Sequence, residues 1–155
     1  DINVRGTYLC SKIALPYLKE SDNPHILNLS PPINLKAKWF ENFPGYTMSK
    51  YAMSMCTFGL SAEYKKYNIA VNSLWTKTAI NTSALAMLGG IVSPEQCRKP
   101  EIVADAAFII LSKKSDECTG KFFIDEEILR SSGEINFEKY AVKPGVKLFE
   151  DLYLD

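Results

Sequence analysis

The sequence predicts an α/β fold built on a doubly wound parallel sheet, and three observations support this class. Short, mostly apolar runs predict buried strands at 25–30, 69–74 and 121–125. Apolar side chains at helical spacing predict helices at 3–20, 46–66 and 101–112. Helices and strands alternate along the chain, an order typical of parallel strands joined by helical crossovers.

Local signals place the ends of these elements. Pro16 lies near the end of the first helix and is expected to kink or shorten its last turn. The first strand ends at Pro31-Pro32, and Pro44-Gly45 precedes the long second helix. We also expect a short helix near 83–88. One domain is expected at 1–130, followed by an arm or the start of a linker at 131–155, where no strong period is visible.

Composition excludes several classes of function. The chain has 155 residues, 46% of them hydrophobic and 23% charged, which is ordinary for a globular domain. The formal net charge is zero, so nothing in the composition indicates nucleic-acid binding. No apolar run approaches the roughly 18 residues of a membrane span. We expect no metal site, because His25 is the only histidine and no cysteines form a C-x-x-C pair.

The chemistry is predicted at a tyrosine and a lysine. Tyr46 and Lys50 lie four residues apart on a predicted helix and therefore share a face. A cation beside a tyrosine lowers the pKa of its phenol, so that it can exchange a proton with a carbonyl or hydroxyl group. Tyr8 and Lys12 have the same spacing. Only Tyr46, however, begins a helix after a loop that follows a strand-end serine, and ligands of parallel sheets bind at such strand ends.

The order of these landmarks resembles that of the short-chain dehydrogenase/reductase family, over roughly residues 1–125. The resemblance implies a Rossmann-like fold, of which this chain would be the C-terminal half only. Details such as Ser30-Pro31-Pro32 and Tyr140-Ala141-Val142-Lys143-Pro144-Gly145 resemble one branch of the family. The matching segments are 1–7, 26–30, 46–50, 69–73 and 119–125.

The resemblance implies a role for each matching residue. Tyr46 would be the general acid/base, and Lys50 would lower its pKa and bind the ribose hydroxyls of the cofactor. Asn3 would hold a water that links Lys50 to solvent, although an asparagine there is also consistent with a helix cap. Ser30 is the candidate for holding the substrate oxygen. The implied cofactor-binding residues are Tyr46, Lys50, Thr76, Ala79 and Thr82.

Three departures from the family pattern bear on the expected site. Pro31 stands where the family normally has its substrate-binding serine, so either Ser30 substitutes for it or the site has no such hydroxyl. The usual Pro-Gly after the second strand is Thr76-Lys77, and the usual Gly-Gly after Asp125 is Glu126-Glu127. No Gly-rich phosphate-binding turn is present. We therefore expect the isolated chain to be a fragment without turnover, prone to aggregation.

The function implied by the resemblance is hydride transfer between a nicotinamide cofactor, NADP or NAD with NADP favoured, and an alcohol or carbonyl. Leu85, Met87 and Leu88 in the segment 78–98 suggest an apolar substrate, lipid-like or steroid-like, with ordinary helix packing of these side chains as the alternative. The alternative is a non-catalytic binding or regulatory protein on a dehydrogenase scaffold. The resemblance also implies a homo-oligomer and an intracellular protein of the peroxisome or mitochondrion.

Overall fold

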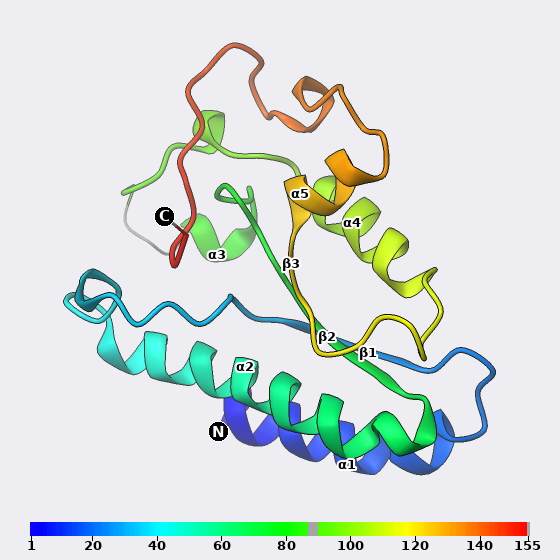
Figure 1. Ribbon diagram of the computed structural model, residues 1–155. Coiled ribbons are helices and arrows are strands. Elements are labelled where there is room, and N and C mark those ends of the chain that lie inside the picture. Colours follow the sequence, from blue (N-terminus) through cyan, green and yellow to red (C-terminus); the bar gives the residue numbers. More distant parts are fainter. Residues whose placement is uncertain (87–89, 155) are drawn as a thin grey trace. The chain divides into compact units, whose positions relative to one another are not determined.

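The computed structural model describes residues 1–86 and 90–154, which form two compact units (Figure 1). The first unit contains Asp1–Trp75 and Leu111–Phe123. The second contains the described residues of Thr76–Ile110 and Ile124–Leu154. The end of the chain therefore belongs to the same unit as the segment that follows the second strand, and the two units are considered separately below.

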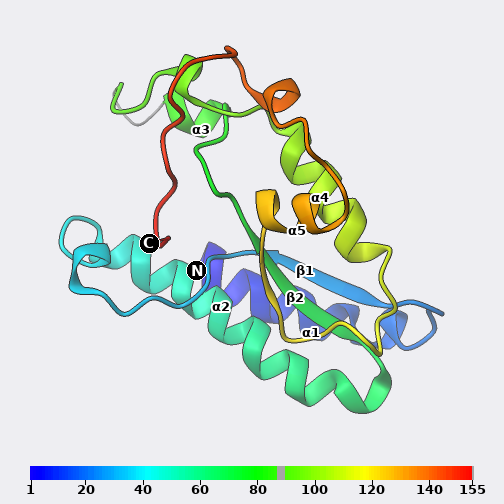
Figure 2. The ribbon, with the colours of Figure 1, turned by 45° about the horizontal axis from the view of Figure 1, so that its top comes forward.

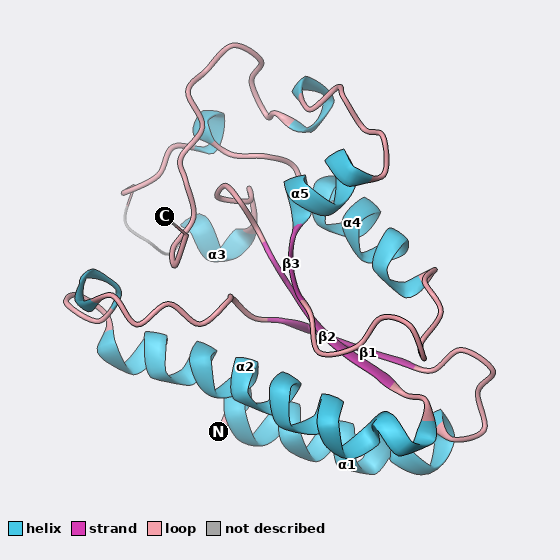
Figure 3. Cartoon of the chain, viewed as in Figure 1, coloured by secondary structure: helices cyan, strands magenta, loops and turns pink. Residues whose placement is uncertain are grey.

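The predicted parallel sheet is confirmed. Three strands, β1 (His25–Leu29), β2 (Ala70–Trp75) and β3 (Phe122–Ile124), lie in the order β1-β2-β3 (Figure 3). Strands β1 and β2 pair in parallel from His25 opposite Ala70 to Leu29 opposite Leu74. Every residue of β2 is buried, as expected for the central strand of a sheet with helical crossovers.

Two helices of the first unit cover one face of the sheet. Helix α1 (Thr7–Leu18) follows a short π-helix, η1 (Ile2–Gly6), and lies beside α2 (Pro44–Tyr64) in both Figure 1 and Figure 2. Helix α2 begins two residues before the predicted start, because proline is well tolerated in a first helical turn. It continues into a 3₁₀ turn, η3 (Lys65–Tyr67). The core shared by α1, α2 and β2 contains Leu60, Tyr64, Ile69 and Val71.

The turn before β3 depends on a glycine. Gly120 has φ of +70°, and a Cβ atom there would lie 3.1 Å from Ser61 Oγ. Its amide donates a hydrogen bond of 2.9 Å to the carbonyl of Val71 in β2. Only glycine combines this backbone angle with this close approach to α2, so the Thr119-Gly120 signal in the sequence has a structural cause.

The second unit contains mostly short elements. They are α3 (Ser83–Ala86), η4 (Pro94–Gln96), α4 (Glu101–Leu111), α5 (Asp125–Ser131) and η5 (Glu138–Tyr140). Helix α4 matches the prediction, whereas residues 87 and 88 of the expected helix at 83–88 lie outside the described residues. The third strand was predicted to reach residue 125, but it ends at Ile124 and Asp125 begins α5. The acidic run 125–127 stabilises that helix start, since carboxylates interact favourably with the positive end of the helix dipole.

Candidate active site

Helix α2 presents the predicted tyrosine and lysine one turn apart. Tyr46 lies in the first turn with 45% of its surface exposed, and Lys50 is partly buried. The Nζ atom of Lys50 donates a hydrogen bond of 3.1 Å to the carbonyl of Leu29, the last residue of β1. It also lies 5.2 Å from the ring centroid of Trp75, the last residue of β2. The ammonium group is therefore held at the carboxyl ends of two parallel strands, where such sheets bind ligands.

Asn3 is attached to the same turn of α2. Its Nδ2 atom donates a hydrogen bond of 3.0 Å to the Oγ atom of Ser49. Ser49 in turn donates from Oγ to the carbonyl of Tyr46 at 2.8 Å. A residue 46 positions earlier in the chain thus contacts the turn that joins Tyr46 to Lys50, so the sequence-predicted Asn3, Tyr46 and Lys50 belong to one local structure.

The loop before α2 is fixed to the helix by two buried side chains. Thr47 donates from Oγ1 to the carbonyl of Trp39 at 2.6 Å. The hydroxyl of Tyr51 donates to the carbonyl of Asn34 at 2.5 Å and accepts a hydrogen bond of 3.2 Å from the amide of Asn34. Because these anchors lie on either side of Lys50 and next to Tyr46, the start of α2 has one defined position relative to the loop.

Ser30 lies inside a buried polar network rather than on a surface. Its side chain is 0% exposed, and its Oγ atom is 2.8 Å from Ser73 Oγ. Ser73 donates to Thr57 Oγ1 at 2.8 Å, and Asn28 Nδ2 donates to the same oxygen at 2.8 Å. The neighbouring Pro31 accepts a hydrogen bond at its carbonyl from Ser54 at 2.6 Å. This network joins β1 and β2 to α2, and it was not anticipated from the sequence.

The sequence of α2 did contain a signal for this network, namely its serine and threonine residues. The residues of α2 that are buried include Thr47, Ser54, Thr57 and Ser61. Helical spacing places the apolar Met48, Met55 and Phe58 on one stripe of α2, but these side chains are 56–65% exposed. Hydroxyl groups therefore face the sheet, where they meet the polar side chains of the strands.

The predicted cofactor residues beyond β2 lie in the second unit, and most are bonded to other parts of that unit. Thr76 donates from Oγ1 to the carboxylate of Asp151. Ala79 is buried; its amide donates to the carbonyl of Phe149, and its carbonyl accepts from Arg98, both at 2.9 Å. Thr82 is exposed and precedes α3. The backbone of Ala79 is thus engaged within the chain, whereas the side chain of Thr82 faces solvent.

Asp125 is buried next to this segment. Its Oδ1 atom accepts hydrogen bonds from the amides of Lys77 at 2.8 Å and Glu126 at 2.6 Å, while its buried Oδ2 atom has no hydrogen-bond partner among the described residues. Burial raises the pKa of Asp125 to about 6, against the lowering effect of the two amides and of nearby Arg98. Sequence analysis placed Asp125 at a strand end but did not anticipate its contact with Lys77.

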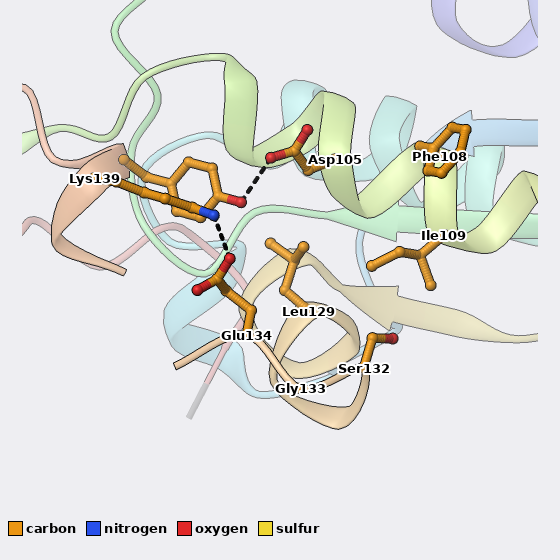
Figure 4. Close-up of a pocket in the computed structure, with 9 residues that line it drawn as sticks. Asp105, Phe108, Ile109, Leu129, Ser132, Gly133, Glu134 and Lys139 are labelled. Carbon is orange, nitrogen blue, oxygen red and sulfur yellow. Dashed lines mark hydrogen bonds and ion pairs between the residues drawn. The ribbon is translucent and has the colours of Figure 1, made fainter. Parts of the chain in front are cut away.

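A hollow of about 360 Å³ lies between α4, α5 and η5 of the second unit (Figure 4). Its polar side chains are paired with one another. Tyr140 donates from its hydroxyl to Asp105 at 2.7 Å, and Lys139 forms an ion pair with Glu134. None of the predicted site residues lines it, and we assign it no ligand.

No helix among the described residues is long and apolar enough to cross a membrane. No group of three or more histidine, cysteine, aspartate or glutamate side chains among them is arranged to hold a metal ion.

Comparison with known proteins gives direct evidence of the family to which the chain belongs. The family model described as short chain dehydrogenase matches residues 1–88. Hydroxysteroid dehydrogenase-like protein 2 of Xenopus laevis is 57% identical over 154 residues, which cover 99% of this chain and 36% of that protein. The chain thus spans about a third of the length of the curated relatives it matches, and the branch indicated by the sequence details is confirmed.

Solved structures agree on the fold. A "putative dehydrogenase" from Xanthomonas campestris has a TM-score of 0.95 and 42% identity, covering 99% of this chain and 56% of that one. A "putative short chain dehydrogenase" from Escherichia coli, complexed with NADPH, has a TM-score of 0.67 and 21% identity over 81% of this chain and 50% of that one. At that identity the second likeness concerns the fold alone.

Proposed function

The chain belongs to the short-chain dehydrogenase family, and from that premise we propose that it supplies the proton-transfer residues of a nicotinamide-dependent oxidoreductase. The observation that supports this most is the position of Lys50, whose ammonium group is bonded to the end of β1 one helical turn after Tyr46. When bound, NAD(P) would supply or accept the hydride, and the partner substrate would be an alcohol or a carbonyl compound.

In this proposal Tyr46 transfers the proton that accompanies the hydride. Tyr46 is 45% exposed in the first turn of α2, so part of the residue can be reached from solvent. Lys50 is a fixed positive charge on the same helix face, and such a charge favours the phenolate form of a neighbouring tyrosine. Asn3 would hold a water that carries protons between Lys50 and solvent, and its bond to Ser49 keeps it next to that turn.

The residues present suit a nicotinamide cofactor in one specific respect. The Nζ atom of Lys50 lies at the carboxyl edge of the sheet, where it donates a hydrogen bond of 3.1 Å to the main-chain carbonyl of Leu29. An ammonium group at the strand ends of a parallel sheet is a suitable donor to ribose hydroxyls, and we propose this role for Lys50. We propose Thr76, Ala79 and Thr82 as further cofactor contacts. NADP is favoured over NAD by resemblance.

The substrate is proposed to be lipid-like or steroid-like, on the strength of Leu85, Met87 and Leu88 in the segment 78–98. Of these three residues, Leu85 is described and packs against a buried cluster of Ala79, Val92 and Cys97. Met87 and Leu88 lie outside the described residues. The peroxisomal or mitochondrial placement is likewise proposed from resemblance.

A homo-oligomer is proposed from the outer face of the paired helices. Ile13 and Tyr17 of α1 are 69% and 74% exposed, and Phe58 of α2 is 65% exposed. Apolar side chains that gather on one exposed face typically mark an interaction surface. Light scattering of the full-length protein should give the mass of a dimer or tetramer, and a monomer at micromolar concentration would contradict the proposal.

A non-catalytic binding or regulatory role is the second candidate, and one observation favours it. Position 31 offers no hydroxyl, and the hydroxyl of Ser30 is fully buried against Ser73. The usual hydrogen bond to a substrate oxygen therefore has no evident donor at these two positions. The intact Tyr46 and Lys50 favour the catalytic proposal.

The two candidates are separated by an assay of the full-length protein. It would be incubated with NADP(H) and, separately, NAD(H), together with a panel of lipid-like alcohols and ketones, and the absorbance of the reduced nicotinamide would be followed. The catalytic proposal predicts turnover of at least one compound above the rate without enzyme. Binding of the cofactor without turnover of any compound would instead support the regulatory role.

A further inference from the structure

The segment Thr76–Ala79 immediately follows β2 and lacks the residues that would shape it locally. It contains neither proline, which fixes φ, nor glycine, which permits positive φ. Hydrogen bonds from other parts of the second unit hold it, among them the bond that the amide of Arg98 donates to the carbonyl of Ala79. Two further parts are called the carboxylate anchor (Asp125) and the tail strap (Phe149–Asp151).

The carboxylate anchor acts on the main chain. Oδ1 of Asp125 accepts a hydrogen bond of 2.8 Å from the amide of Lys77, and the side chain is 0% exposed. Removing a carboxylate from water is unfavourable unless hydrogen bonds compensate, and here one oxygen is compensated by two amides while the other has no partner in the described part of the chain. The burial of this group is therefore tied to the conformation of Lys77.

The tail strap lies antiparallel to the same segment. The amide of Ala79 donates to the carbonyl of Phe149 at 2.9 Å, and the amide of Asp151 donates to the carbonyl of Lys77 at 3.0 Å. Thr78 and Glu150 form an antiparallel bridge between these two bonds. The carboxylate of Asp151 accepts a further hydrogen bond from Thr76 Oγ1.

The strap is itself fixed within the unit. The amide of Phe149 donates to the carbonyl of Gln96 at 2.9 Å. Earlier in the chain, the amide of Val142 donates to the carbonyl of Cys97 at 3.0 Å, so the stretch from 142 to 149 that leads into the strap is attached at both ends to residues 96–97. A strap attached in this way can restrict the motion of the segment that it pairs with.

We propose that Asp125 and the segment Phe149–Asp151 position Thr76–Ala79 to receive the nicotinamide end of the cofactor. This inference rests on the proposed function. Hydrogen bonds from the anchor and the strap hold the backbone of Thr76–Ala79, which has no helix or strand of its own to fix its conformation. They act through the segment and are not proposed to touch substrate or cofactor.

The nicotinamide end is indicated by the position of the segment in the chain. It begins one residue after Trp75, whose ring lies 5.2 Å from the ammonium group of Lys50. Lys50 is the proposed partner of the nicotinamide ribose. A loosened segment should therefore weaken contacts to the nicotinamide end and leave those to the adenosine end unchanged.

The test compares two ligands on the full-length protein. Isothermal titration would measure the affinity for NADP⁺ and for 2′-phospho-ADP-ribose, which lacks the nicotinamide, or for NAD⁺ and ADP-ribose if NAD is preferred. The variants are Asp151→Ala for the strap and Asp125→Ala for the anchor. Asp125→Asn keeps an acceptor oxygen for Lys77, and Glu150→Ala alters an exposed neighbour whose side chain makes none of the strap's hydrogen bonds.

Asp151→Ala and Asp125→Ala should each lower affinity for the dinucleotide about fivefold or more, the value of roughly one lost hydrogen bond, with the affinity for the nicotinamide-free ligand changed less than about twofold. Asp125→Asn and Glu150→Ala should bind both ligands as the wild type does. If Asp125→Ala does not fold, Asp151→Ala alone decides the result.

Unchanged dinucleotide affinity in Asp151→Ala, or an equal loss for both ligands, would overturn the positioning role while leaving the proposed function intact. Wild-type protein that binds no dinucleotide would overturn the proposed function and this inference together.

Discussion

The two units place their proposed functional residues by different means. In the first unit, Tyr46 and Lys50 are positioned by a helix of 21 residues whose buried face is bonded to two strands. In the second, the segment Thr76–Ala79 belongs to no helix or strand and is held by a carboxylate and by a strap from the end of the chain. Regular structure therefore positions the proposed functional residues of the first unit, and long-range pairing positions those of the second.

This difference predicts which property each substitution changes. A side chain on α2 can be removed while the helix stays in place, so its loss should mainly affect the proton-transfer chemistry. The segment Thr76–Ala79 has no helix or strand of its own, so the loss of one of its anchors should loosen the backbone and affect binding and stability. The substitutions below test that contrast.

Lys50→Ala should lower both turnover and cofactor affinity. It removes both the proposed charge beside Tyr46 and the proposed ribose contact, so kcat should fall by about 10²-fold or more and cofactor affinity should also weaken. Steady-state kinetics and cofactor titration of the full-length protein would measure both. Lys12→Ala is the matched control, since Lys12 has the same spacing from Tyr8 and lies 3.7 Å from Glu63 in a solvent-exposed pair. Equal kinetics in the Lys50 and Lys12 variants would contradict the assignment.

The pH dependence of stability should reveal the burial of the Asp125 carboxyl group in the second unit. The pKa of Asp125 is about 6 in the folded chain and about 4 in the unfolded one. Between these pH values the folded state binds more protons, so the free energy of unfolding should fall as pH rises, by on the order of 2–3 kcal/mol, and level off above about pH 7.

Asp125→Asn, which cannot titrate, is the control for this effect. Denaturant unfolding at several pH values from 4 to 7 should show that wild type loses stability relative to the variant as the pH rises. The contributions of neighbouring Arg98, Glu126 and Lys77 are present in both proteins and should largely cancel in the difference. A difference that does not vary with pH would show that the carboxyl group is not held in the buried environment described.

Ser30→Ala should have the smallest effect on turnover. Because its hydroxyl is buried against Ser73, we expect kcat to change by less than about threefold, with a loss of stability of about 1–3 kcal/mol from the disturbed network. Kinetics and thermal unfolding would be measured together. A fall in kcat of about 10²-fold without loss of stability would restore the catalytic role suggested by the sequence.

Local patterns predicted most of the first unit. Strand and helix periods are properties of neighbouring residues, and the four-residue spacing of Tyr46 and Lys50 is enough to place both on one helix face. The orientation of α2 was less predictable. Its apolar Met55 and Phe58 face outward, because the polar Asn28 and Ser73 of the strands bond to hydroxyl groups on the opposite side of the helix.

The structure of the second unit was harder to predict from the sequence, and the reason is physical. Thr76 and Asp151 are 75 residues apart, and no period links the strap to its partner segment. Helix α5 was missed because it has only seven residues and follows β3 without a turn, although the acidic residues 125–127 mark its start. Pairing between distant irregular segments is decided by the folded structure and leaves little trace in local sequence.

The most direct test of the account concerns Tyr46 itself. Tyr46→Phe keeps the ring and removes only the hydroxyl, and Tyr8→Phe makes the same change in the other tyrosine–lysine pair. In the full-length protein, Tyr46→Phe should lose at least about 10³-fold in kcat while binding the cofactor as wild type does, and Tyr8→Phe should retain full turnover. Equal turnover in Tyr46→Phe and the wild type would contradict the account.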